Sequence, residues 1–234
     1  CDNEHYTRKV LYGFALYCQG ESLYITLEDA RHDARLLDYL ANDPHKITYN
    51  AKEFYHAAAR NGIACSDFAL DLMLGSFLLD SSITSFERFL DHYQIALPLT
   101  LDEVYGKKGK NILPEFDRQC AYMEALLAGM APIVAPMKEK LSDEGMWELL
   151  TTLEMPLSRI LFKMEQEGIH ISEKVLDEIG EVTHARMEEN AARVYEYAGH
   201  EFNINSPKQL GIVLFDEIGL KSGKKRSTAV EVLE

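Results

Sequence analysis

The stretch "HEFNINSPKQLGIVLFDEIG", His200–Gly219, places a polar segment between two helical patterns and sets where the second begins. Ser206 is followed by Pro207 and, three residues after the serine, by Gln209. This spacing is a capping box with proline at the first helical position. We therefore predict a helix that starts at Pro207, turns its apolar residues inward and stops near Gly219.

A long helical pattern precedes this stretch. Ser172 can cap a helix running to Ala198, with an apolar stripe along one face and Gly199 at its end. At about 1.5 Å per residue this helix is about 40 Å long. A second helical pattern, Trp147 to Glu167, comes before it and carries Pro156 as a site for a kink. We expect the two helices to form a projecting arm, with the polar stretch at its tip.

The chemistry of that tip suits an anion. A helix N-terminus offers unpaired N–H groups and about half a positive charge. A second capping signature, Thr228 to Glu231, adds another helix start next to a basic run. Capping boxes and short basic runs are common, so the pattern alone favours an ordinary solvated surface over a nucleic-acid site. The side chains that suit phosphate and sugar oxygens are Asn203, Asn205, Ser206, Lys208, Gln209, Lys224, Lys225 and Arg226.

The first part of the chain alternates strands and helices. "KVLYGFALYC" (9–18) and "SLYITL" (22–27) have strand patterns joined by the turn-prone "QGE". A helix is expected over 29–40, a strand over 46–50 and a further helix ending at Gly62, followed by mostly helical patterns. This order predicts an α/β domain followed by long helices only.

Composition limits the possible functions. With 234 residues, 47% of them hydrophobic, the chain is long enough for real cores. A net charge of −14 argues against a surface that binds a polyanion everywhere, so any contact with nucleic acid must be local. Its four cysteines form no C-x-x-C pair, and no apolar run approaches the roughly 20 residues of a membrane span. We expect a cytoplasmic monomer without membrane contact, and interpret the chain as a fragment because it starts at Cys1 and stops at Glu234 within a pattern.

Several stretches resemble a known family. "FNINSPKQLGIVLFDEIGL" (202–220) and "EMPLSRILFKMEQEGIHIS" (154–172) closely resemble the start of the polymerase module of bacterial family A DNA polymerases. "DLMLGSFLLD" (71–80) and "DEVYGKKGK" (102–110) resemble the exonuclease-like domain that precedes that module. The resemblance implies an α/β ribonuclease H-like, exonuclease-like domain at 1–141, followed by an all-α thumb with two long helices at 142–234.

The resemblance also implies what the chain contacts. In this family the thumb tip holds duplex primer–template DNA across its minor groove. Polymerisation needs magnesium held by carboxylates of a palm domain, and this chain ends before a palm; we therefore expect no cofactor here. The tip loop departs from the family, because "GKKRSTAVEVLE" lacks several residues that usually separate "GKK" from "ST". The residues implied at the DNA contact are Asn203, Asn205, Ser206, Lys208, Gln209, Lys224, Lys225, Arg226, Ser227 and Thr228.

The proofreading relatives cut 3′ nucleotides with two metal ions, which need several converging carboxylates. The candidate first motif, Asp2 and Glu4, stands too close to the start of the next strand. In the second motif Asn50 and Lys52 recur, but Phe54 occupies the position of the metal-binding aspartate. Near Ala121 or Tyr122, the third motif lacks its tyrosine–aspartate pair.

We therefore predict a vestigial exonuclease domain with no catalytic residues and no metal site, and expect Asp71 to cap a helix rather than bind metal. Two alternatives stay open. One is an active metal-dependent 3′–5′ exonuclease in which Asp2 and Glu4 bind metal. The other is a helical module whose tip binds protein.

Overall fold

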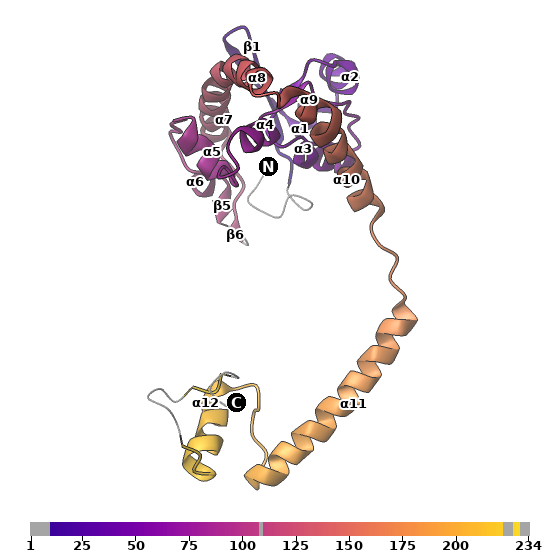
Figure 1. Ribbon diagram of the computed structural model, residues 1–234, viewed down its shortest axis with the longest axis vertical. Coiled ribbons are helices and arrows are strands. Elements are labelled where there is room, and N and C mark those ends of the chain that lie inside the picture. Colours follow the sequence, from indigo (N-terminus) through magenta and orange to yellow (C-terminus); the bar gives the residue numbers. More distant parts are fainter. Residues whose placement is uncertain (1–9, 108–109, 222–226, 230–234) are drawn as a thin grey trace. The chain divides into compact units, whose positions relative to one another are not determined.

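Residues 10–107, 110–221 and 227–229 are described by a computed structural model of the chain, drawn in Figure 1. The chain divides into two units, Cys1–Gly168 and Ile169–Glu234. The first unit combines a hairpin and several helices around shared cores. The second consists of one long helix, a polar segment and a short helix.

The first described element is an antiparallel hairpin, β1 (Gly13–Cys18) and β2 (Glu21–Thr26). Cys18 pairs with Glu21, so the loop has only two residues, Gln19 and Gly20. Both have positive φ, 52° and 90°, which is the type I′ turn that matches the twist of a hairpin. The predicted pair of strands is confirmed.

Two short helices follow where one was expected over 29–40. They are α1 (Leu27–Ala30) and α2 (Ala34–Asn42). Asp33 causes the break, because its carboxylate accepts from the N–H groups of Arg35 and Leu36 and so starts a new helix. The prediction of a single helix over 29–40 is therefore wrong.

The predicted strand and helix over 46–62 are confirmed as β3 (Ile47–Thr48) and α3 (Ala51–Arg60). β3 pairs in parallel with β4 (Leu70–Asp71), the short strand that leads into α4 (Leu72–Leu79). This parallel pair brings the start of α3 beside the start of α4.

The rest of the first unit is mainly helical. It includes a short antiparallel hairpin of β5 (Gly106–Lys107) and β6 (Lys110–Asn111). Thirteen buried residues make the main core, among them Phe89, Leu141 and Leu150, which water does not reach. The helices around this core are α4, α5 (Phe86–His92), α6 (Leu101–Tyr105), α7 (Phe116–Met130), a 3₁₀ turn (Ala131–Ile133) and α8 (Val134–Asp143).

The continuous helical stretch Phe116–Asp143 is, among the described residues, the one long and apolar enough to cross a membrane, and an 18-residue window within it has a mean hydropathy of 1.4. Polar residues are scattered along the stretch, so the sequence contains no uninterrupted apolar run of that length. Tyr122, Leu126, Met137 and Leu141 of this stretch are buried in the main core. Of the apolar window 28% is buried, so the stretch contributes one face to the core.

The predicted helix over 147–167 has three parts: α9 (Trp147–Leu149), a π-helical turn (Leu150–Glu154) and α10 (Met155–Glu167). Pro156 lies in the first turn of α10, where a missing N–H costs nothing, so the expected kink is a widened turn just before it.

α10 packs on α3 within the first unit. The Phe162 ring lies 5.5 Å from that of Tyr55, and the Arg159 guanidinium lies 4.2 Å from the centre of the Tyr55 ring. Glu165 accepts from Lys52 Nζ through one carboxylate oxygen and lies against His56 Nε2 through the other, both at 2.7 Å. The expectation that α10 forms one arm with the next helix is therefore corrected, because its buried side chains need α3 as a partner.

In the second unit, α11 (Glu173–Ala198) is one uninterrupted helix of 26 residues (Figure 1). Ser172 caps it by accepting from the N–H of Val175, and Gly199 ends it in the left-handed region at φ 77°, as predicted. The short α12 (Pro207–Ile212) follows and continues into a π-helical turn, Val213–Glu217. The first compact unit ends at Gly168. The boundary after residue 141, between the exonuclease-like domain and the thumb, stays a prediction.

Candidate functional sites

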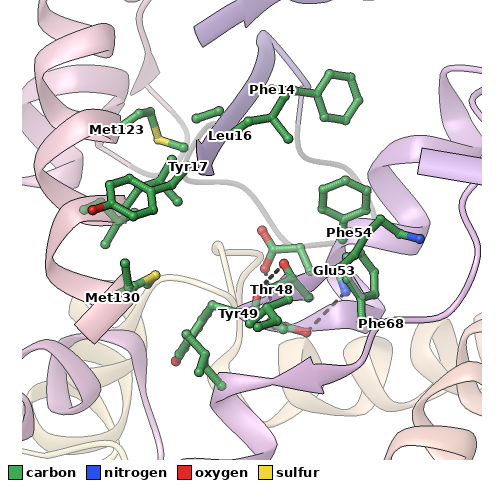
Figure 2. A pocket seen from close by; sticks show the side chains of 18 of the residues that line it. Phe14, Leu16, Tyr17, Thr48, Tyr49, Glu53, Phe54, Phe68, Met123 and Met130 are labelled. Carbon is green, nitrogen blue, oxygen red and sulfur yellow. Dashed lines mark hydrogen bonds between the residues drawn. The ribbon is translucent and has the colours of Figure 1, made fainter. Parts of the chain in front are cut away.

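The first unit contains a pocket of about 580 Å³ between β1, β3 with α3, and α7. Figure 2 shows its wall, in which Phe14 and Leu16 of β1 lie across from Phe54 and Phe68, with Met123 and Met130 of α7 at the side. Among the described residues that line it, Glu53 is the one with a carboxylate. The pocket is therefore mainly aromatic and aliphatic.

This lining does not fit a two-metal centre. Two divalent cations about 3.5–4 Å apart need several carboxylates to offset their repulsion. The described residues include no group of three or more histidine, cysteine, aspartate or glutamate side chains placed to hold a metal ion. Asp2 and Glu4 lie outside the described residues.

Position 54, where the proofreading motif would need an aspartate, is part of an aromatic cluster. The Phe54 ring lies 5.8 Å from that of Phe14 and 5.2 Å from that of Phe68. A carboxylate here would replace a half-buried ring and lose part of its hydration against the two neighbouring rings. Asn50 and Lys52, which recur from the same motif, serve other contacts: Asn50 caps α3 through Glu53 N–H, and Lys52 pairs with Glu165.

The third motif region is also packed. Tyr122 is buried against Tyr105, with ring centres 6.3 Å apart, whereas Ala121 is exposed. Gln119 is buried and donates to the Tyr105 hydroxyl at 3.0 Å. These residues fill the main core instead of presenting groups to the pocket.

Asp71 is fully buried at the junction of α3 and α4. One carboxylate oxygen accepts from Ala51 N–H at 2.7 Å, and the other accepts from Asn50 N–H and Met73 N–H at 2.9 Å each. Burial raises the pKa of Asp71, and the backbone N–H groups act in the opposite direction. The geometry is that of a shared helix cap, as expected for this residue.

The second candidate site is the polar segment before α12. Its exposure alternates: Asn203 and Asn205 are exposed, whereas Phe202, Ile204 and Ser206 between them are half-buried. The segment thus turns its apolar side chains inward and its two amides outward. Lys208 and Gln209 are exposed on the first turn of α12.

In the side-chain hydrogen bonds within this segment, side-chain oxygens accept from backbone N–H groups. Asn203 Oδ1 accepts from Asn205 N–H at 3.0 Å, and Ser206 Oγ accepts from Gln209 N–H at 3.4 Å. Gln209 Oε1 accepts from Asn203 N–H at 2.8 Å, and not from Ser206 N–H as a standard capping box requires. Within the described residues the side-chain NH₂ groups of Asn203, Asn205 and Gln209 have no partner, which leaves them as donors to solvent.

The second capping signature is described only in part. Ser227 and Thr228 are half-buried, and Ser227 Oγ accepts from Ala229 N–H at 3.3 Å. A methyl group placed on Gly211 would lie 3.8 Å from the Thr228 side chain, so this residue packs near α12. Lys224, Lys225, Arg226 and the helix predicted after Thr228 lie outside the described residues.

His200 belongs to this segment and was not predicted from the sequence. Its Nδ1 lies 3.1 Å from the carbonyl oxygen of Glu201, and its Nε2 lies 2.8 Å from a carboxylate oxygen of Glu217. Both neighbours are acceptors, so only the doubly protonated ring satisfies both. The bond to the Glu201 carbonyl and the Glu217 carboxylate together raise the pKa of His200. The sequence contains one indication of this role: a histidine directly after Gly199, the residue that ends α11.

We expect the His200 ring to titrate above its ordinary value of 6.5. Because the raised pKa belongs to the folded state, the contact stabilises the segment fully below pH 6.5 and is lost as pH rises through the raised value. NMR titration of the ring should show this, and Glu217→Gln should lower the pKa. Glu201→Gln makes the same change in charge but keeps the carbonyl, so it should lower the pKa less; equal effects would contradict the pairing.

Comparisons with known proteins match both parts of the chain. The family model "DNA polymerase I, ribonuclease H-like domain" matches residues 1–128, and "DNA polymerase family A" matches residues 173–234. DNA polymerase I of Geobacillus stearothermophilus is 32% identical over 240 residues, and that of Streptococcus pneumoniae strain R6 is 33% identical over 242 residues. The alignments cover 100% and 99% of this chain but 27% of each relative, so the chain spans about a quarter of their length.

The POL domain of Pol1 from M. smegmatis, solved in complex with DNA primer-template and dNTP, has a similar fold. Its TM-score is 0.62 at 23% identity, covering 95% of this chain and 38% of that one. The predicted fold class, a ribonuclease H-like domain followed by a helical part, is confirmed. The extent of the first family match, across more than half of the chain, shows that this chain belongs to the DNA polymerase I family of family A DNA polymerases.

Proposed function

We propose that this chain is the part of a cytoplasmic DNA polymerase I that joins an inactive exonuclease-like domain to a thumb that binds duplex primer–template DNA during replication and repair. The observation that supports the thumb assignment is the segment before α12. It exposes the side-chain amides of Asn203 and Asn205 close to Lys208 in the sequence. The side-chain oxygens of Asn203 and Gln209 accept hydrogen bonds within the segment, so the NH₂ groups remain as donors. Neutral donors and one cation can bind phosphate and sugar oxygens, and such contacts do not recognise the base sequence.

The inactive exonuclease-like domain is supported by the aromatic cluster at Phe54 and by the pocket, in which Glu53 is the one carboxylate among the described lining residues. We propose that the chain alone neither polymerises nor cuts DNA. Addition of deoxynucleotides with magnesium is proposed for the longer protein.

Duplex binding tests the thumb assignment. A labelled primer–template hairpin should bind the full chain at about 50 mM salt and lose affinity as salt rises, with a shallow slope because few cations contribute. Changing Asn205, Lys208 and Lys225 together to alanine removes charge-assisted bonds and should weaken binding by about 30-fold or more. Fluorescence anisotropy measures both effects.

Lys174→Ala is the matched control, because this lysine is exposed in the same unit at the far end of α11. It should change the affinity less than twofold. No binding by the unmodified chain at low salt would contradict the thumb assignment and favour the protein-interaction module.

A further inference from the structure

A four-residue turn, Asn203–Ser206, connects the end of α11 to the start of α12; we call it the tip turn. The Asn203 carbonyl accepts from Ser206 N–H at 2.9 Å, which closes the turn. The Asn203 side chain also accepts from Asn205 N–H at 3.0 Å. Both bonds lie within the turn, so they shape it but do not attach it to the helix.

Gln209 makes that attachment. A glutamine at the third helical position usually reaches back to the N–H of the capping residue. Here Ser206 N–H is already bonded inside the tip turn, and Gln209 Oε1 instead accepts from Asn203 N–H, six residues earlier, at 2.8 Å. One side chain thus joins the first residue of the turn to the helix that follows it.

We propose that Gln209 is a positioning residue and not a DNA contact: it holds the tip turn so that the amides of Asn203 and Asn205 are presented together. This assignment rests on the proposed duplex binding. It distinguishes Gln209 by its bond, which runs from the first turn of α12 back to the first residue of the tip turn. Loss of one such neutral bond should cost roughly three- to tenfold in the population of the closed turn.

Amide exchange in the free chain gives the first test. Gln209→Leu removes the acceptor at nearly constant size, whereas Gln209→Glu keeps an acceptor at the same place and lacks the NH₂ group. Hydrogen exchange of the Asn203 amide should be roughly three- to tenfold faster in the leucine variant and nearly unchanged in the glutamate variant. An unchanged rate in the leucine variant would overturn the proposal.

A double-mutant cycle on the duplex gives the second test. Gln209→Leu should weaken hairpin binding by roughly three- to tenfold in the unmodified chain, and by less than twofold in a chain that also carries Asn203→Ala and Asn205→Ala. A glutamine that touched DNA by itself would have the same effect in both backgrounds, and this result would overturn the proposal. If the unmodified chain binds no duplex, the proposed function fails together with the DNA part of this assignment, while amide exchange still decides whether Gln209 holds the turn.

Discussion

Replacing Asp71 by alanine is expected to lower the free energy of unfolding of the first unit by about 3–5 kcal/mol. The carboxylate accepts from the N–H groups of Asn50, Ala51 and Met73 at 2.7–2.9 Å in a site that water does not reach. Removing it leaves these donors without an acceptor, and each such group costs about 1–3 kcal/mol. Denaturant unfolding followed by the fluorescence of Trp147, the single tryptophan, measures the loss.

Two variants serve as controls. Asp80→Ala removes a cap whose carboxylate accepts from Ser82 N–H at the surface, and should cost less than about 1 kcal/mol. Asp71→Asn keeps one acceptor but turns an NH₂ group toward the donors, so its effect should be intermediate. A gain in stability on Asp71→Ala would instead indicate a metal ligand held under electrostatic strain, and would contradict the capping role.

Phe54→Asp should also destabilise the first unit by about 3–5 kcal/mol, although it restores the aspartate that the proofreading motif requires. The ring packs on Phe14 and Phe68, so the change removes aromatic contacts and places a carboxylate among carbon atoms. Glu53 is the one carboxylate among the described residues that line the pocket, so the added acid would have too few described partners for two metal ions. We therefore expect no nuclease activity from the variant.

The measurements are denaturant unfolding and nucleotide release from a single-stranded 3′ end with magnesium or manganese. Phe54→Leu keeps an apolar side chain and should cost less than half as much as Phe54→Asp. Steady release by the unmodified chain would show that the active exonuclease alternative is correct. Release by the aspartate variant alone would show that one missing ligand, and not the packed site, stops the reaction.

The sequence predicted the fold best where a turn, a helix end or a helix cap depends only on residues close to it in the chain. The two-residue turn between β1 and β2, the end of α3 before Gly62 and the cap of α11 at Ser172 all follow from residues within one turn of the feature. The failures arose where a distant partner decides. Asp33 divides a predicted helix by capping anew, and α10 leaves the predicted arm because Phe162 is buried against Tyr55 of α3. Periodicity alone does not identify the surface that a stripe covers.

The same limit applies to the candidate sites. The spacing indicated that Ser206 caps a helix starting at Pro207, because a cap depends on residues within one helical turn. It assigned the wrong partner to Gln209, since the tip turn had already taken the Ser206 N–H. It also missed the pairing of His200 with Glu217, which depends on how the chain returns after α12.

The anchoring of α10 has a mechanical consequence. Glu165 lies three residues before Gly168, where the first unit ends, and its carboxylate is bonded to both Lys52 and His56 of α3. The two bonds of Glu165 and the packing of the Phe162 ring hold the C-terminal part of α10 on α3, so fraying of this helix from its C-terminal end has to break these contacts first.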